Sequence, residues 1–101
     1  MRIVDDALLQ EFRAAWKCEW CNKPTPSGCD PHHLFARGMG GGGRLDVRIN
    51  LISLCRECHT DLHDGKIGRD QLAVVIVERE IWRLQRMAKG GTDGTETRAS
   101  G

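Results

Sequence analysis

Four of the five cysteines of this chain form two Cys-x-x-Cys pairs, Cys18 with Cys21 and Cys55 with Cys58. Such pairs present thiolates to a tetrahedral zinc ion, and two pairs together fill all of its positions. A zinc ion without an open position cannot bind water, so the site is predicted to be structural. Disulfides are the alternative, but thiols stay reduced inside cells, where such pairs more often bind metal. Cys29 is left over as a plain small residue.

All four histidines lie between residues 30 and 63. His59 and His63 are four residues apart on a predicted helix, so both rings project from one face and can share a metal ion. The plainer alternative is a pair of surface histidines on a short helix. A hairpin that returns His32 and His33 to this helix would gather three or four imidazoles beside the cysteines, which packing alone does not explain.

The first part of the chain must position the first two histidines. Asp5 or Asp6 can cap a helix that is expected to pack over the metal-rich centre. Its apolar positions recur at helical spacing: Leu8, Leu9, Phe12, Ala15 and Trp16. Pro31 biases the preceding residue towards an extended conformation, and a short strand is predicted over residues 32–35.

The middle of the chain predicts the rest of the hairpin and a second helix. The glycine run 38–43 reads as a flexible connection; a phosphate-cradling loop is the alternative, but no Gly-Lys-Ser/Thr follows it. Residues 51–54 predict the returning strand. A helix of about two turns is expected over residues 56–64, ended by Gly65 in the position that favours a left-handed cap.

A third, longer helix is predicted over residues 71–88, with Asp70 as its cap. The β-branched run 74–77 admits a strand, but the length of the apolar pattern favours a helix. Its apolar positions spread over more of the circumference than one contact face needs, which suggests packing against a partner chain, such as a second copy. Residues 90–101 are rich in Gly, Thr and Ser and are expected to form a disordered tail.

The order of these motifs resembles a known family. Asp-x-His-His at residues 30–33, followed by Asn50 nine residues before His59 in Asn-Leu-x-x-Leu-Cys-x-x-Cys-His, is similar to the HNH endonucleases of the ββα-metal (His-Me finger) fold. The likeness is greatest to the small stand-alone members with two Cys-x-x-Cys pairs, often found in phages and bacteria. It covers about residues 18–63 and implies an α+β fold, in which a β-hairpin and a short helix form the core (residues 18–64) of a single nuclease domain (residues 1–89). The four-cysteine zinc site would staple this core, and the N- and C-terminal helices would flank it.

The resemblance also implies a role for each matching residue. His33 would be the general base that takes a proton from the attacking water, a task that suits an imidazole. His32, His59 and His63 would hold one divalent cation, Mg²⁺, Mn²⁺, Ni²⁺ or Zn²⁺, which would stabilise the charge that develops on the phosphate and the leaving 3′-oxygen. Asn50 would hold the loop and help to orient His33; without the histidines it would be an ordinary turn or cap residue.

This chain departs from the family pattern at the first metal position. Many members have an acidic residue where this chain has His32. Asp30 lies two residues earlier, on the same strand face by simple alternation, and could ligate instead of His32 or beside it. Adjacent strand residues point to opposite faces, so the joint use of His32 and His33 is expected to require an irregular start to the strand.

Size and charge limit the classes of protein further. With 101 residues the chain forms one domain, and neither a signal peptide nor a segment of transmembrane length is visible, so a cytoplasmic location is expected. The formal charge of +1 does not indicate a nucleic-acid binder, but between residues 31 and 56 four arginines face Asp46 alone. Such runs are usually solvated surface. Beside the predicted active strand, however, Arg37, Arg44 and Arg48 are candidates for phosphate contact.

These features predict a metal-dependent DNA endonuclease that nicks one strand at a time with little sequence specificity. The products implied by the resemblance carry 5′-phosphate and 3′-hydroxyl ends. The main alternative is a non-catalytic zinc module that binds nucleic acid or protein, which leaves His33 and Asn50 without a role. A pure interaction adaptor that uses the C-terminal helix would explain neither metal site.

Overall fold

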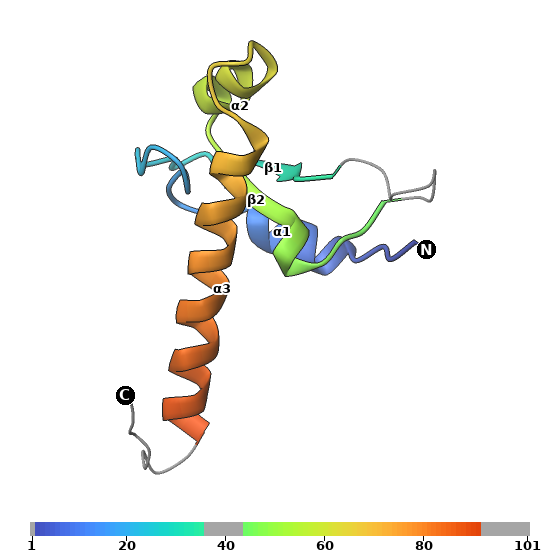
Figure 1. Cartoon of the computed structure of the whole chain (residues 1–101), viewed down its shortest axis with the longest axis vertical. Helices are drawn as coiled ribbons and strands as arrows, with labels where there is room; N and C mark the ends of the chain where they lie inside the picture. The colour runs from blue at the N-terminus through green and yellow to red at the C-terminus, as the bar shows by residue number, and fades with distance from the viewer. Residues whose placement is uncertain (1, 36–43, 92–101) are drawn as a thin grey trace.

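The computed structural model describes residues 2–35 and 44–91 as a small α+β fold in which a two-stranded hairpin is surrounded by three helices (Figure 1). The elements in chain order are α1 (Asp6–Arg13), β1 (Asp30–His33), the 3-10 turn η1 (Arg48–Asn50), β2 (Leu51–Leu54), α2 (Arg56–His63) and α3 (Arg69–Gly91). The predicted fold class is confirmed. The predicted glycine-rich connection falls outside the described residues.

The hairpin is antiparallel and regular. Asp30 lies opposite Leu54 and His33 opposite Leu51. The first strand was expected at residues 32–35 and was therefore placed two residues too late. Pro31 does not prevent the earlier start, because β1 has a single neighbour, and an edge strand tolerates a residue without an N–H.

All four residues of β2 are buried, and successive side chains serve opposite faces of the hairpin. On one face Ile52 and Leu54 join the main core, whose buried members are Cys18, Leu34, Ile52, Leu54, Cys55, Cys58, Ile67, Leu72 and Ile76. On the other face Ser53 Oγ donates a hydrogen bond of 2.7 Å to the carbonyl of Phe12 in α1. Three of the paired cysteines are thus members of the apolar core itself.

The helix α1 begins as predicted but ends earlier. The Asp5 side chain caps it by accepting a hydrogen bond from the N–H of Leu8 at 3.0 Å. The helix ends at Arg13, and Ala15 and Trp16, expected in its apolar stripe, lie beyond it; Trp16 is 70% exposed. The reason is tertiary, because the carbonyls of Arg13, Ala15 and Trp16 accept hydrogen bonds from residues 25–29 instead of continuing the helix. The helix packs on both strands of the hairpin.

The ends of α2 and α3 follow from local hydrogen bonds. Gly65 has φ +81° and donates to Leu62 O while Lys66 N–H donates to Asp61 O, the pair of bonds that defines a Schellman motif. The predicted left-handed cap is confirmed. The third helix begins at Arg69, so Asp70 lies inside its first turn and is not the cap. Instead, the N–H of Gly68 donates to Gln71 Oε1 at 2.7 Å.

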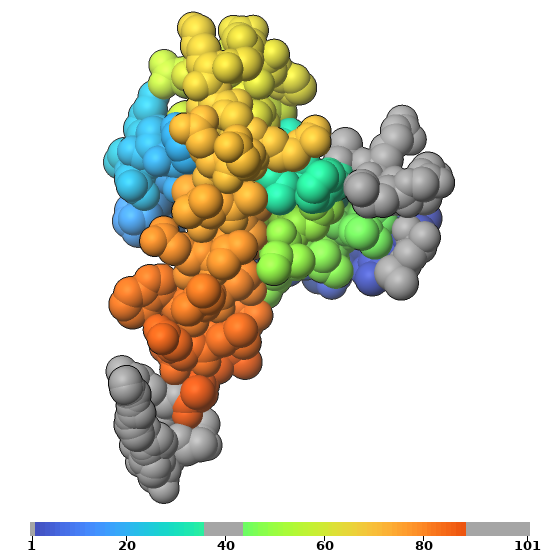
Figure 2. Space-filling model, in the orientation of Figure 1, coloured from blue at the N-terminus to red at the C-terminus, as the bar shows by residue number. Residues whose placement is uncertain are grey.

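The long helix α3 extends well past the rest of the chain (Figures 1 and 2). Its first turns bury Leu72 and Ile76 in the core, and the helix continues to Gly91, beyond the point where the tail was expected to begin. Apolar side chains remain exposed on its other faces: Val74, Val77, Ile81, Trp82, Leu84 and Met87. None of the described helices is long and apolar enough to cross a membrane.

Candidate metal centres and catalytic site

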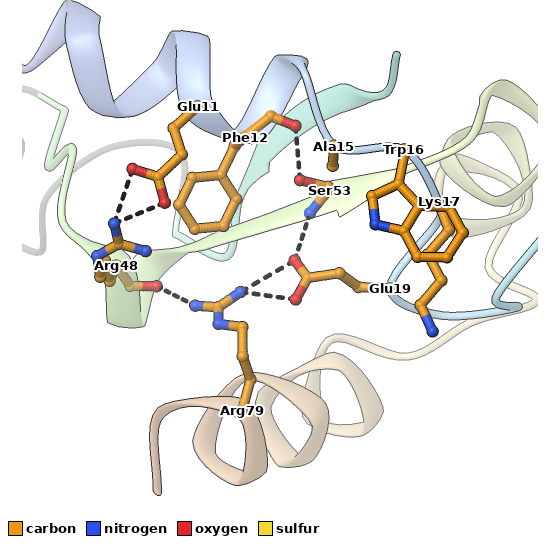
Figure 3. A pocket seen from close by; sticks show the side chains of 9 residues that line it. All are labelled: Glu11, Phe12, Ala15, Trp16, Lys17, Glu19, Arg48, Ser53 and Arg79. Atoms are coloured by element: carbon orange, nitrogen blue, oxygen red, sulfur yellow. Dashed lines mark hydrogen bonds and ion pairs between the residues drawn. The ribbon is translucent and has the colours of Figure 1, made fainter. Parts of the chain in front are cut away.

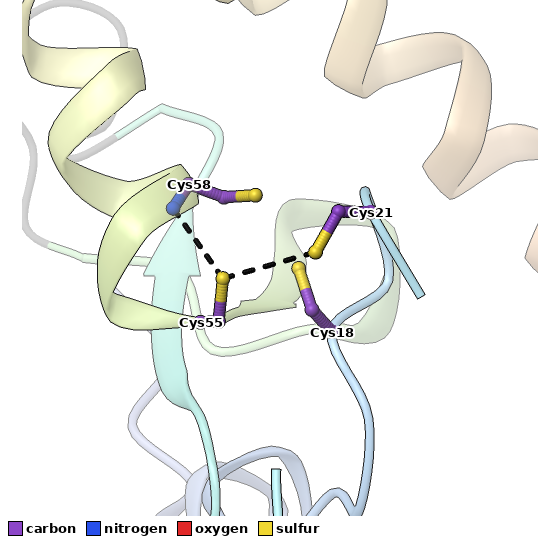
Figure 4. A group of neighbouring side chains, drawn as sticks. All are labelled: Cys18, Cys21, Cys55 and Cys58. Atoms are coloured by element: carbon purple, nitrogen blue, oxygen red, sulfur yellow. Dashed lines mark hydrogen bonds between the residues drawn. The ribbon is translucent and has the colours of Figure 1, made fainter. Parts of the chain in front are cut away.

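The four paired cysteines point their sulfur atoms at one another (Figure 4). All four sulfurs lie within 4.8 Å of one another, and those of Cys21 and Cys55 are 3.9 Å apart. A tetrahedral zinc ion with Zn–S bonds of about 2.3 Å requires sulfur separations of about 3.8 Å. The cluster therefore has the composition and size of a four-thiolate zinc site. It joins the segment after α1 to the first turn of α2.

Backbone N–H groups also prepare these sulfurs for a metal. The N–H of Trp20 donates to Cys18 Sγ and that of Cys58 to Cys55 Sγ, both at 3.4 Å. Burial alone would raise the pKa of Cys18, but hydrogen bonds from the backbone of Cys21, Cys55 and Trp20 outweigh it and lower the pKa to about 7. Burial and the neighbouring sulfurs raise the pKa of Cys58. One thiol thus ionises readily, while others keep their protons until a metal displaces them.

Three histidines meet between β1 and α2. The ring centroids of His32 and His59 are 5.5 Å apart, and those of His59 and His63 are 4.9 Å apart. Burial and then the nearby charges of His59, His63, His33 and Arg69 lower the pKa of His32 to about 4, so this ring is neutral at physiological pH, as a metal ligand must be. The three histidines are less tightly gathered than the cysteines. In the described part of the chain, the four cysteines are the one group whose ligand atoms all lie within 4.8 Å of one another.

Asp30 lies on the same side of the hairpin as His32, as alternation predicts. Its Oδ2 is 3.3 Å from His59 Nδ1 and accepts a hydrogen bond of 3.2 Å from Arg56 Nε. The carboxylate therefore touches one of the candidate ligands on the ring nitrogen Nδ1. In metal sites such a carboxylate commonly fixes the orientation of the histidine that it contacts.

His33 points to a different partner. Its Nε2 lies 2.7 Å from Oδ1 of Asp46, whose side chain is fully buried, whereas the His33 side chain is 21% exposed. Burial alone would raise the pKa of Asp46, but the N–H of Asp5 and the side chains of His33 and Arg44 outweigh it and hold the pKa below its usual value. Asp46 is thus an ionised carboxylate that contacts the His33 ring through Nε2 and does not contact Nδ1.

The position of Asp46 depends on the N-terminal segment. Ile3 forms a parallel bridge with Leu45, and the N–H of Asp46 donates to Ile3 O at 2.8 Å. The N–H of Asp5 donates to Asp46 Oδ2, also at 2.8 Å. Sequence reasoning did not assign a role to Asp46. The signal was present, since Asp46 is the lone acid among four arginines.

Asn50 is buried and fastens the chain on either side of residues 36–43. Its Oδ1 accepts from the N–H of Phe35 at 2.9 Å, and its Nδ2 donates to the carbonyls of Phe35 and Leu45 at 3.2 and 3.0 Å. These contacts fix the backbone two residues after His33 and one residue before Asp46. The role expected of Asn50 in catalysis stays a prediction. The His33 ring itself is hydrogen-bonded to Asp46, which accepts through Oδ1.

The segment that contains both sites matches proteins of known type. A family model described as HNH endonuclease matches residues 18–65. This match covers just under half of the chain, from the first paired cysteine to just past the end of α2. The resemblance expected from the sequence is confirmed.

Two curated proteins of Escherichia coli (strain K12) resemble parts of the chain. The type IV methyl-directed restriction enzyme EcoKMcrA is 29% identical over 86 residues, which are 78% of this chain and 28% of that protein. The uncharacterized protein YdfU is 35% identical over 51 residues, 50% of this chain and 14% of that protein. The chain thus spans less than a third of either relative. No solved structure matches it.

The arginines proposed to contact DNA are engaged with acids of the HNH domain and of α1. Arg44 donates through Nε and Nη2 to Asp46 at 3.1 and 3.0 Å. Arg48 donates through Nη2 to both carboxylate oxygens of Glu11 at 2.7 and 2.6 Å. Arg37 lies outside the described residues. Their role as phosphate contacts stays a prediction.

A surface hollow of about 250 Å³ lies beside α1 (Figure 3). Arg79 crosses its floor, donates to Glu19 at 3.0 and 3.1 Å and lies 5.0 Å from the ring of Phe12. The lining residues are Glu11, Phe12, Ala15, Trp16, Lys17, Glu19, Arg48, Ser53 and Arg79. No histidine or paired cysteine lines it, so this hollow is separate from both metal sites.

Proposed function

We propose that this protein is a metal-dependent DNA endonuclease that nicks one strand at a time with little sequence specificity. The observation that carries the proposal is the buried Asp46 carboxylate against Nε2 of His33. In β1, His33 directly follows His32, a member of the group formed with His59 and His63. A non-catalytic zinc module has no need for a buried acid held on a histidine.

His33 is the general base in this proposal. Asp46 fixes the tautomer with the proton on Nε2, so Nδ1 carries the lone pair that accepts the proton of the attacking water. The imidazolium that results is stabilised by the Asp46 charge. Asn50 keeps the flanking backbone in place through Phe35 and Leu45. A base, its orienting acid and a fixed backbone are the arrangement that proton transfer requires.

His32, His59 and His63 would hold the catalytic divalent cation. When bound, the cation supplies a positive charge that stabilises the phosphate and the leaving 3′-oxygen. The three rings are already neighbours, and His32 is neutral near pH 7 because burial and adjacent charges lower its pKa to about 4. Asp30 would orient His59 through Nδ1, a role that agrees with its contact and leaves the metal to the histidines.

The test is a nicking assay with supercoiled plasmid and Mg²⁺, Mn²⁺, Ni²⁺ or Zn²⁺. Wild type should convert supercoiled plasmid into the open circle, His33→Ala should not, and the exposed variant Asp64→Asn should act as wild type. Resealing by DNA ligase without prior end treatment would establish 5′-phosphate and 3′-hydroxyl ends. If wild type and His33→Ala nick equally, or wild type nicks with none of these metals, the catalytic assignment is wrong.

The DNA contacts and the cytoplasmic location stay proposals. To bind phosphate, Arg44 must release Asp46 and Arg48 must release Glu11. Both arginine side chains are about one-third exposed. Arg48 is the simpler case, because Glu11 is on the surface and can be released to water. Arg44 would have to leave the acid that supports His33.

A homodimer through α3 is a further part of the proposal. Val74, Val77, Ile81 and Leu84 are exposed and spaced by three, four and three residues, like the a and d positions of a pair of packed helices. Two such repeats form a short seam, so the dimer should be weak and depend on concentration. Sedimentation equilibrium of wild type and Ile81→Glu tests this, and a wild type that stays monomeric at every concentration contradicts it.

A further inference from the structure

An exposed aromatic ring lies at the edge of the candidate active site. Phe35 follows His33 by two residues, so their Cα atoms are at most about 7 Å apart. Phe35 as a whole is 43% exposed. Single exposed apolar side chains are common and need no explanation. Phe35 differs because its backbone N–H and carbonyl are both bonded to the buried Asn50, at 2.9 and 3.2 Å. The side chain of Phe35 is therefore exposed while its backbone is held in place by hydrogen bonds.

A guanidinium lies over one side of this ring. Arg69, in the first turn of α3, lies 5.2 Å from the centroid of Phe35. In the space-filling view the chain around the end of β1 borders the first turns of α3 on the face shown (Figure 2). Arg69 thus lies beside an exposed ring that follows β1, the strand of His32 and His33, by two residues.

Arg69 differs from most other arginines near the site in its partners. Arg44, Arg48 and Arg56 each have an acidic partner. No such ion pair involves Arg69 anywhere in residues 2–35 and 44–91. A phosphate could approach its guanidinium without displacing a carboxylate. Unlike Arg44, Arg48 and Arg56, Arg69 has no acidic partner in the described part of the chain, and it contacts an aromatic ring.

We infer that Phe35 and Arg69 form a nucleotide-binding platform beside the scissile phosphate, where the ring stacks on a base of the bound DNA strand and the guanidinium pairs with an adjacent phosphate. The inference rests on the proposed function for its substrate and adds a base-stacking contact and a phosphate contact to it. Aromatic rings and guanidinium planes are the side-chain surfaces on which bases stack. Every base has such a face, so the platform would bind DNA without reading its sequence.

The platform also predicts which DNA is preferred. A base can reach the Phe35 ring only when it is unpaired or has left its stack, and unstacking costs free energy in a regular duplex. Single strands and distorted duplexes should therefore bind more tightly than a regular duplex of the same length and charge. This preference would place the enzyme on DNA that is already opened or bent.

The experiment measures binding without cleavage. The 101-residue chain with the His33→Ala substitution is titrated into labelled single-stranded and duplex oligonucleotides. Binding is followed by fluorescence anisotropy at several salt concentrations. Phe35→Leu should weaken single-strand binding by about fivefold or more, the lower bound for loss of one base–aromatic stack, and leave the salt slope unchanged. Arg69→Gln should weaken binding to both and reduce the salt slope by about one. Arg69→Lys should restore the slope.

Arg86→Gln is the matched control, because Arg86 is another exposed arginine of α3, far along the helix from the histidines. It should bind within about twofold of its parent. Zinc content and thermal unfolding establish that each variant is folded. If Phe35→Leu or Arg69→Gln behaves as Arg86→Gln does, or if the parent binds neither oligonucleotide, the inference is wrong.

Failure of this inference and failure of the proposed function can be distinguished. A protein that nicks plasmid in a His33-dependent way, but whose Phe35 and Arg69 variants bind DNA normally, keeps the proposed function and loses the platform. A protein that never nicks, but whose binding depends on Phe35 and Arg69 as described, keeps the platform as a DNA-binding site and loses the catalytic proposal.

Discussion

Substitution of Asp46 by Asn tests the proposed base most directly, since it keeps the size of the side chain and removes its charge. The carboxylate lies 2.7 Å from His33 Nε2 and also accepts from Arg44 at 3.0 Å. An amide cannot serve both donors. If its oxygen faces His33, its N–H₂ faces the guanidinium. If it is turned over, it donates to Nε2 and drives the ring proton onto Nδ1, the atom that must accept the proton of water.

The expected loss can be worked from the charges. A carboxylate about 4 Å from the centre of an imidazolium, at an effective dielectric constant of about 20, stabilises it by about 4 kcal/mol. At about 1.4 kcal/mol per decade this corresponds to about 10³-fold in rate. Arg44 shares the carboxylate and reduces its effect, so a fall of about 10²–10³ in the nicking rate is predicted, within the usual range for general-base catalysis.

The assay is single-turnover nicking of plasmid, with DNA binding measured separately. The rate of the chemical step should fall while the affinity for DNA stays within about twofold, because Asp46 is buried and cannot touch the substrate. Loss of a charged hydrogen bond should also cost about 1–3 kcal/mol of stability, so the rates must be taken well below the unfolding temperature. Asp64→Asn, at the exposed end of α2, is the control. An Asp46→Asn protein that nicks within about threefold of wild type would refute the reasoning.

Three further predictions concern the metal site, a buried acid and two glycines. Cys55→Ser should abolish the tighter of two classes of bound metal, because three thiolates leave a tetrahedral zinc site incomplete; metal analysis after gel filtration counts the ions, and an unchanged zinc content contradicts the site. Burial alone would raise the pKa of Glu80, but hydrogen bonds from its two arginine partners outweigh it and hold the pKa below the ordinary 4.5. The stability lost in Glu80→Gln should therefore be largest above pH 4.5 and shrink as the pH falls below it, as denaturant titrations at several pH values would measure; a difference that grows on acidification would contradict this. Both Gly28 and Gly65 have positive φ, but a Cβ on Gly28 would lie 2.5 Å from Arg13 O whereas one on Gly65 meets nothing within 4 Å. Urea titration should give a loss of about 1 kcal/mol for Gly65→Ala and about twice that or more for Gly28→Ala, and equal losses would contradict the steric argument.

The clustering of the paired cysteines and of three histidines could be predicted because the spacings that bring them together are local. Cys-x-x-Cys spacing and a pair of histidines four apart specify neighbours through short-range geometry alone. The alternation along a strand likewise placed Asp30 on the side of His32, and the structure has it there, against His59. The expected irregular strand start was unnecessary, since a regular strand lets the two histidines face different partners.

The partner of His33 could not be predicted, because its position depends on contacts between distant segments. Asp46 is set by the bridge from Ile3 to Leu45, which spans most of the N-terminal half of the chain. The early end of α1 has a similar cause, since the N–H groups of Thr25 and Cys29 donate to carbonyls at and just after the end of the helix. Counting charges also could not show that Arg44 is committed to an acid. Patterns report which residues are present, whereas pairing depends on the assembled fold.

The two halves of the candidate site have separate structural supports. Cys55 and Cys58 hold the start of α2 to the cysteine cluster, so the zinc site determines where His59 meets His32. The N-terminal segment and the buried Asp46 determine where His33 points. Strand β1 joins the halves, because its alternation sends one histidine to each side. A metal-free protein can therefore lose the order of the ligand group while the His33–Asp46 pair remains intact, since none of the bonds that hold that pair involves a cysteine.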